Sequence, residues 1–193
     1  MKTKSIFLST LCFFLLMGGT GIAANTALQY PVKIENHKGK DLTPSQALDL
    51  ASKNPHVFIL DVRSRPEYVL LGHPTIAHHV PYKFWTGKHS SKGYGMVTNP
   101  HFAEDLKARF NPKTDTLIFM CRSGKRSCLA ANAAAASHWP EDKLYNMMGG
   151  FEGDKLKNKD SAYYGQRILG GWKNEGLPWT YKIDPKLAYP EVK

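Results

Sequence analysis

The chain has 193 residues, 42% of them hydrophobic, which is enough for one ordinary core and, on length, for one domain. Its formal net charge of +10 can attract nucleic acid or anionic membranes. The basic residues are scattered, however, with no arginine-rich stripe and no nucleic-acid-binding motif, so we expect no nucleic-acid partner. We interpret the charge as a solvated surface that also steers small anions.

The first 24 residues have the pattern of a secretory signal. Lys2 and Lys4 precede a 12-residue apolar run at 6–17, and small residues follow at 18–24. The run is shorter than the roughly 20 residues that a membrane span needs. We therefore expect cleavage after position 23 or 24, a periplasmic or otherwise exported protein, and no stable membrane insertion after cleavage. Removal of the two lysines would leave 24 basic and 16 acidic residues, a net charge of +8.

The mature chain is expected to begin with a polar arm and then a helix and a strand. Residues 25–42 predict a loosely packed N-terminal arm, with a short strand at 32–35. Thr43, Pro44 and Gln46 form a capping box with proline at the first helical position, and Asn54-Pro55 stops the helix. The apolar run at 57–62, interrupted only by Asp61, is typical of a strand buried on both sides of a parallel sheet.

Further along the chain, strands are expected to alternate with helices. This alternation predicts an α/β fold around a mainly parallel sheet, in which sites lie beyond the carboxyl ends of the strands. Residues 82–98 follow no periodicity, and their glycine, serine, lysine and aromatic residues predict a long surface loop. The other expected elements are a short helix at 65–71, a strand at 76–80, a helix from the Asn99-Pro100 cap to 110, a strand at 117–120, a helix at 126–138, a strand at 144–147, and helices at 151–157 and 162–174.

The stretch 116–127, TLIFMCRSGKRS, places a cysteine where covalent chemistry is expected. Cys121 ends a short apolar run, and a basic turn containing glycine and then an alanine-rich helix follow it. Backbone N–H groups of the turn, the positive end of the helix dipole and the nearby cations all favour a thiolate. A buried cysteine is usually an inert packing residue. The position at the end of the run, with three cations in the next five residues, favours a nucleophile instead.

Cys128 is the second cysteine of the expected mature chain. In an oxidising compartment it can pair with Cys121, although the seven-residue spacing does not ensure disulfide geometry. We interpret Cys128 as a helix-packing residue, with a resolving thiol as the alternative. The spacing matches neither CxxC nor a zinc-ligand pattern, and the sequence has no HExxH, so we predict no metal and no cofactor.

With these motifs in place, the chain resembles the rhodanese family, the thiosulfate sulfurtransferases and their single-domain relatives. The loop at 121–127 is the most specific part of the resemblance. The middle motif departs from the family pattern, with HPTIA at 73–77 where the family usually has His-Ile-Pro-Gly-Ala. The matching segments are LDVR at 60–63, EY at 67–68, GH at 72–73, VP at 80–81, CRSGKRS at 121–127, GGF at 149–151, WK at 172–173 and GLP at 176–178.

The resemblance implies a rhodanese-like α/β domain, with a mainly parallel five-stranded sheet and helices on both faces. This domain would span residues 43–180, with an insertion at 82–98 that is longer than the family leads us to expect. The expected organisation is a cleaved signal peptide at 1–24, an N-terminal arm at 25–42, the domain at 43–180 and a C-terminal tail at 181–193.

The resemblance also implies sulfur transfer. The Cys121 thiolate would take the outer sulfur of an anionic donor such as thiosulfate, become a persulfide, and pass the sulfur to a thiol, to cyanide or to a protein acceptor. Asp61 and Arg63 would hold the loop by ion pairing or hydrogen bonds rather than take part in chemistry. The expected substrate-binding residues supply charge, hydroxyl donors and an unusual backbone conformation, and they are Arg122, Ser123, Gly124, Lys125, Arg126 and Ser127.

Two other functions are weighed against this one. In the first, the protein is a non-enzymatic persulfide carrier or interaction module, and the insertion and the tail form its docking surface. In the second, it is a phosphatase or arsenate reductase, whose loop is roomy enough for a tetrahedral oxyanion and whose arginine lies six positions after the cysteine. Here that position is Ser127 and the arginine is Arg126, so the shorter loop favours a sulfur atom.

Overall fold

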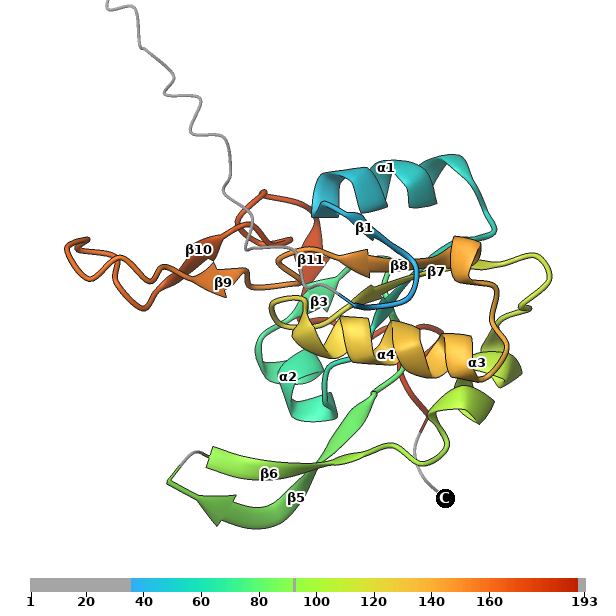
Figure 1. The fold of residues 1–193 in the computed structure, drawn as a ribbon, viewed down its shortest axis with the longest axis horizontal. Coiled ribbons are helices and arrows are strands. Elements are labelled where there is room, and N and C mark those ends of the chain that lie inside the picture. Colours follow the sequence, from blue (N-terminus) through green and yellow to red (C-terminus); the bar gives the residue numbers. More distant parts are fainter. Residues whose placement is uncertain (1–35, 92, 191–193) are drawn as a thin grey trace, which may run out of the picture.

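The computed structural model describes residues 36–91 and 93–190 (Figure 1). The expected signal at 1–24 and the expected strand at 32–35 lie outside the described residues. Within the described part of the chain, no helix is both long enough and apolar enough to span a membrane.

The centre of the fold is a five-stranded sheet in which every pairing is parallel. The strand order is β1-β8-β7-β2-β4, so β7 lies in the middle. The strands are β1 (Lys40–Leu42), β2 (Val57–Asp61), β4 (His78–His79), β7 (Thr116–Met120) and β8 (Leu144–Met147). The expected α/β fold with a parallel five-stranded sheet is confirmed. Edge strand β1 comes from the last residues of the segment that we assigned to the arm.

Helices cover both faces of this sheet, as expected (Figure 1). Helix α1 lies on one face and begins at the predicted capping box, in which Thr43 and Gln46 exchange hydrogen bonds. Helices α3 and α4 lie on the other face. The helices are α1 (Pro44–Lys53), α2 (Arg65–Leu70), α3 (Phe102–Arg109) and α4 (Lys125–Ala136), and a 3-10 turn, η1, spans Glu141–Lys143.

The two faces of β7 belong to two different cores. Leu117 and Phe119 pack in the cluster beneath α3 and α4, whereas Ile118 and Met120 pack in the cluster beneath α1. Successive side chains of a strand point to opposite faces, so a strand between two helical layers is apolar at every position. This arrangement explains the continuous apolar run before Cys121.

Residues 82–98 do not form the predicted surface loop, and that prediction was wrong. They form an antiparallel hairpin of β5 (Lys83–Ser90) and β6 (Gly93–Thr98) that projects from the domain (Figure 1). Most of its residues are exposed on both faces, so the alternation that marks a half-buried strand is missing. Asn99 holds the base of the hairpin: its backbone N–H donates to Tyr82 O at 2.9 Å and its side chain donates to Pro81 O at 3.0 Å.

The helices predicted at 151–157 and 162–174 are also absent. The chain there forms a second protruding segment with the short strands β9 (Asp154–Lys155) and β10 (Arg167–Leu169). Gly153 and Gly171 have φ values of +82° and +99°, which a right-handed helix does not allow. Because a Cβ on Gly171 would lie 2.3 Å from Gly153 N, the two backbones can approach only as glycines. The segment between these glycines consists of turns around the β9–β10 pair.

Smaller differences concern element ends and the tail. The strand predicted at 76–80 is shorter in the structure, where it is β4 (His78–His79). Helix α3 begins after His101 rather than directly after Asn99-Pro100. A short antiparallel ladder joins β3 (His73–Pro74) and β11 (Trp179–Thr180). The tail packs on the domain, because Leu187 O accepts the backbone N–H of His79 at 2.8 Å.

Candidate active site

Cys121 lies directly after β7, at the carboxyl end of the central strand, and α4 begins four residues later. Its side chain is buried, with 1% exposed. The Sγ accepts a hydrogen bond from the backbone N–H of Gly124 at 3.2 Å. Gly124 has a φ of +106°, a conformation that favours glycine and that turns this N–H toward the sulfur. The loop therefore provides a backbone donor and the positive end of a helix to the sulfur.

Ser127 contacts both the sulfur and the structure behind it. Its Oγ is 3.5 Å from Cys121 Sγ, but only 2.7 Å from Gly124 O and 2.6 Å from Asn146 Oδ1. A hydroxyl has one proton, so the shorter oxygen contacts make Ser127 primarily a residue that holds the loop closed. Asn146 is in turn anchored by its Nδ2, which donates to Asp41 at 2.8 Å. Sequence reasoning missed Asn146, although a buried amide within an apolar strand is a signal for such a role.

The chain after β8 fixes the backbone of the cysteine. Phe151 N–H donates to Cys121 O at 2.8 Å, and Glu152 N–H donates to Arg122 O at 3.0 Å. This approach requires glycine at position 150, because a Cβ there would lie 2.3 Å from Cys121 O. The GGF segment at 149–151 is thus a support for the loop.

Asp61 and Arg63 form a buried ion pair next to this support. Both side chains are fully buried, with Arg63 Nη2 2.5 Å from Asp61 Oδ2 and Arg63 Nε 2.9 Å from Asp61 Oδ1. The guanidinium lies over the Phe151 ring, 4.2 Å from its centroid. Asp61 itself pairs in register with Met120, the residue before Cys121. The pair therefore reaches the loop through Phe151 and β7, as a supporting element.

The guanidinium of Arg126 is not an unpaired positive charge beside the Cys121 sulfur. Its guanidinium forms two hydrogen bonds with the Glu67 carboxylate from α2, at 2.7 Å and 2.5 Å. Burial works to raise the pKa of Glu67, but the hydrogen bonds and charge of Arg126 outweigh it and lower that pKa to about 2. The sequence offered no signal for this partner, because the two residues are 59 positions apart.

The Glu67–Arg126 pair is expected to make stability depend on pH in the acid range. The folded-state pKa of Glu67 lies below its ordinary value of 4.5, so the contribution is present above about pH 4.5 and is lost as pH falls toward about 2. Urea unfolding should show Glu67→Gln less stable than the wild type by up to about 3 kcal/mol near neutral pH, with the difference closing in acid. Glu104→Gln is the control, because Glu104 pairs with His101 and both side chains are largely exposed. A difference that stays constant with pH would contradict this account.

The remaining loop residues are more exposed. Arg122 Nε is 2.5 Å from Glu152 Oε2, in a pair at the surface. Lys125 is exposed on the first turn of α4, and Ser123 is half-buried. The seven residues of the predicted loop thus lie together. Both of its arginines, however, are paired with carboxylates, Arg122 with Glu152 and Arg126 with Glu67.

Cys128 faces away from solvent in the second turn of α4. It is buried, and burial raises the pKa of its thiol to about 12. Both described cysteines are free thiols. This environment suits the helix-packing role that we predicted for Cys128. Within residues 36–91 and 93–190, no three His, Cys, Asp or Glu side chains are grouped to hold a metal ion.

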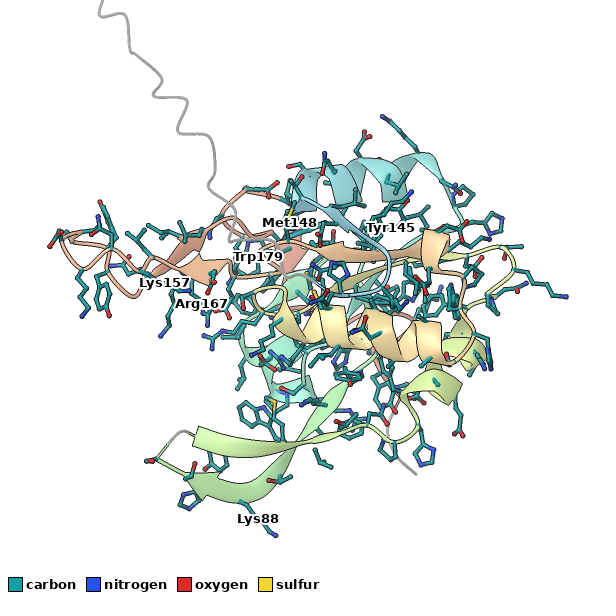
Figure 2. All side chains as sticks on the ribbon, in the orientation of Figure 1. Lys88, Tyr145, Met148, Lys157, Arg167 and Trp179 are labelled. Atoms are coloured by element: carbon teal, nitrogen blue, oxygen red, sulfur yellow. The ribbon has the colours of Figure 1, made fainter. Side chains whose placement is uncertain are left out.

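A pocket of about 450 Å³ adjoins the loop, and we call it the rim pocket. It lies between α2, the loop and the β5–β6 hairpin, which occupies the expected insertion at 82–98. Figure 2 shows Lys88 on this hairpin, and Lys157 and Arg167 on the second protruding segment. The residues that line the rim pocket are Pro66, Glu67, Leu70, Leu71, Trp85, Met96, Arg122 and Arg126.

Comparison with known protein families defines the class of this fold. The sequence matches the rhodanese-like domain family over residues 43–157. The chain therefore belongs to the rhodanese-like domain family, a family of the sulfurtransferase type.

The chain is also similar to individual proteins. The uncharacterized protein RP600 of Rickettsia prowazekii is 29% identical over 143 residues, which cover 74% of this chain and 98% of that protein. The crystal structure of Rv0390 from M. tuberculosis is similar with a TM-score of 0.59 and 30% identity, covering 75% of this chain and 99% of that one. The rhodanese-like domain-containing protein 15 of Arabidopsis thaliana is 40% identical over 72 residues, 37% of this chain and 35% of that protein.

Proposed function

We propose that the protein is a sulfurtransferase that moves a sulfane sulfur from thiosulfate, or a related anionic donor, through a Cys121 persulfide to a thiol or to cyanide. The observation that carries this proposal is the position of the Cys121 sulfur, which faces the Gly124 N–H at 3.2 Å at the start of α4. Membership of the rhodanese-like domain family supports it.

The proposed reaction consists of two displacements on sulfur. In the first, the Cys121 thiolate attacks the outer sulfur of thiosulfate, and the S–S bond of the donor breaks with its electron pair leaving on sulfite. In the second, the acceptor attacks the outer sulfur of the persulfide, and the electron pair of that S–S bond returns to Cys121. The donors around the loop stabilise an anionic sulfur in both the attacking and the persulfide state.

A non-enzymatic persulfide carrier is the second candidate. The two protruding segments, the β5–β6 hairpin and the β9–β10 segment, support it, because they extend from the side of the domain where α4 begins (Figure 1). A protein donor or acceptor would then dock there.

The apolar run at 6–17 supports export, so either role would be carried out outside the cytoplasm.

A phosphatase or arsenate reductase is a weaker candidate. Such chemistry requires a cation that is open to a tetrahedral oxyanion, and here the guanidinium of Arg126 is paired with the Glu67 carboxylate. The loop is also one residue shorter than that chemistry uses.

Thiocyanate formation from thiosulfate and cyanide tests the proposal. We expect sustained turnover with the reduced protein and no release of phosphate from aryl phosphates. One rapid loading of the cysteine without sustained turnover would favour the carrier. Phosphate release without thiocyanate would overturn the proposal.

A further inference from the structure

The rim pocket is larger and more apolar than an inorganic sulfur donor needs. Its volume of about 450 Å³ lies in the range of sites that hold small organic molecules, and thiosulfate or cyanide would occupy only a small part of it. Five of its lining side chains are apolar, from α2, the residue after α2 and the hairpin: Pro66, Leu70, Leu71, Trp85 and Met96.

The charged residues of the rim pocket are already neutralised by partners. Arg126 is paired with Glu67, and Arg122 with Glu152. An anionic body would gain little from arginines that are already bound to carboxylates. The charge of the pocket is therefore suited to a ligand whose body is neutral and apolar.

The hairpin presents its apolar side chains in a defined arrangement. The Trp85 indole stacks on the Tyr94 ring, with centroids 5.8 Å apart and planes 10° from parallel. Met96 Sδ lies 4.0 Å from Arg126 Nη1, which connects the hairpin with the loop. Trp85 and Met96 are 43% and 38% exposed, so a ligand between them and α2 would remove apolar surface from water.

We propose that the rim pocket binds the apolar body of a small organic thiol, and that this thiol is the sulfur acceptor. Trp85 and Met96 determine the preference for an apolar thiol over a polar one. This inference rests on the proposed sulfurtransferase function. Arg122 follows Cys121 directly and Arg126 is on the first turn of α4, so a ligand in the pocket borders the loop that carries the sulfur. The acceptor thiolate attacks the outer sulfur of the persulfide, a new S–S bond forms, and the electron pair of the broken bond returns to Cys121. The product is an organic persulfide, and no external oxidant or reductant is consumed.

The test measures unloading of the persulfide by two thiols of similar acidity, benzyl mercaptan and 2-mercaptoethanol. The reduced full chain is loaded with inorganic polysulfide, which makes the test independent of thiosulfate recognition, and persulfide loss is followed by rapid quenching and intact mass. We expect Trp85→Ala and Met96→Ala to slow unloading by benzyl mercaptan about tenfold, and to change unloading by 2-mercaptoethanol by less than about twofold.

Val97→Ala is the matched control. Val97 is adjacent to Met96 on β6, is 51% exposed and does not line the pocket. Successive strand residues point to opposite faces, so this variant should unload like the wild type. Equal wild-type rates with the two thiols, or equal losses in all three variants, would overturn the inference. Equal wild-type unloading rates with the two thiols would also favour a protein as the sulfur acceptor.

A binding measurement separates this inference from the proposed function. Calorimetric titration with benzyl methyl sulfide, which has no thiol, should show binding that is about tenfold weaker in Trp85→Ala than in the wild type or Val97→Ala. If no persulfide forms by any route but this difference is seen, the proposed function fails and the pocket assignment stands. No binding to the wild type would overturn the pocket assignment.

Discussion

Replacing Cys121 with alanine is expected to lower sulfur transfer by at least about a thousandfold, because the variant lacks the atom that accepts the sulfur. Within residues 36–91 and 93–190 the other thiol is Cys128, which cannot replace it, because Cys128 is buried and its pKa is raised to about 12, so it is protonated at neutral pH. The measurement is steady-state thiocyanate formation from thiosulfate and cyanide.

Cys128→Ala provides the matched control for this variant. It removes the other described thiol, at a position where burial accounts for the residue. Turnover within about twofold of the wild type is expected for Cys128→Ala. Appreciable turnover in Cys121→Ala, or its loss in both variants, would contradict the assignment of Cys121 as the nucleophile.

Asp61→Ala is expected to lower the free energy of unfolding by about 3–5 kcal/mol, because it leaves the Arg63 guanidinium buried without its carboxylate. Both side chains of this pair are fully buried, and Arg63 also donates to Gly72 O at 2.7 Å, which holds it in place. Urea unfolding at neutral pH measures the change. The same substitution should also disturb the loop, since Arg63 packs on Phe151 and the Phe151 N–H binds Cys121 O.

Asp49→Ala is the comparison for the buried pair. Asp49 forms an i,i+4 pair with Lys53 on α1, and both side chains are largely exposed. Exposed pairs of this kind contribute about 0–1 kcal/mol, so little change in stability is expected. Similar losses in the two variants would show that burial of the Asp61–Arg63 pair has no special consequence.

The parts of this structure that the sequence predicts are those with strong local signals. The capping box at Thr43 to Gln46 fixes the start of α1, and the apolar run before Cys121 indicates a strand buried on both faces. Because the cysteine ends that run, its place at the carboxyl end of the sheet follows from topology.

The parts that could not be predicted depend on contacts between distant segments. Glu67 and Arg126 are 59 positions apart, and only the packing of α2 beside the loop shows that the arginine is already paired. Residues 82–98 pair with one another rather than with the domain, so their strands carry no buried face and no periodic pattern. The helices predicted at 151–157 and 162–174 are absent because the glycines at 153 and 171 have positive φ values, which depend on the close approach of two segments.

The intact mass of the reduced protein after incubation with thiosulfate tests the central claim most directly. We predict a gain of one sulfur atom that is present in Cys128→Ala, absent in Cys121→Ala and removed by cyanide. No gain on the reduced wild type, or a gain that survives in Cys121→Ala, would contradict transfer through a Cys121 persulfide.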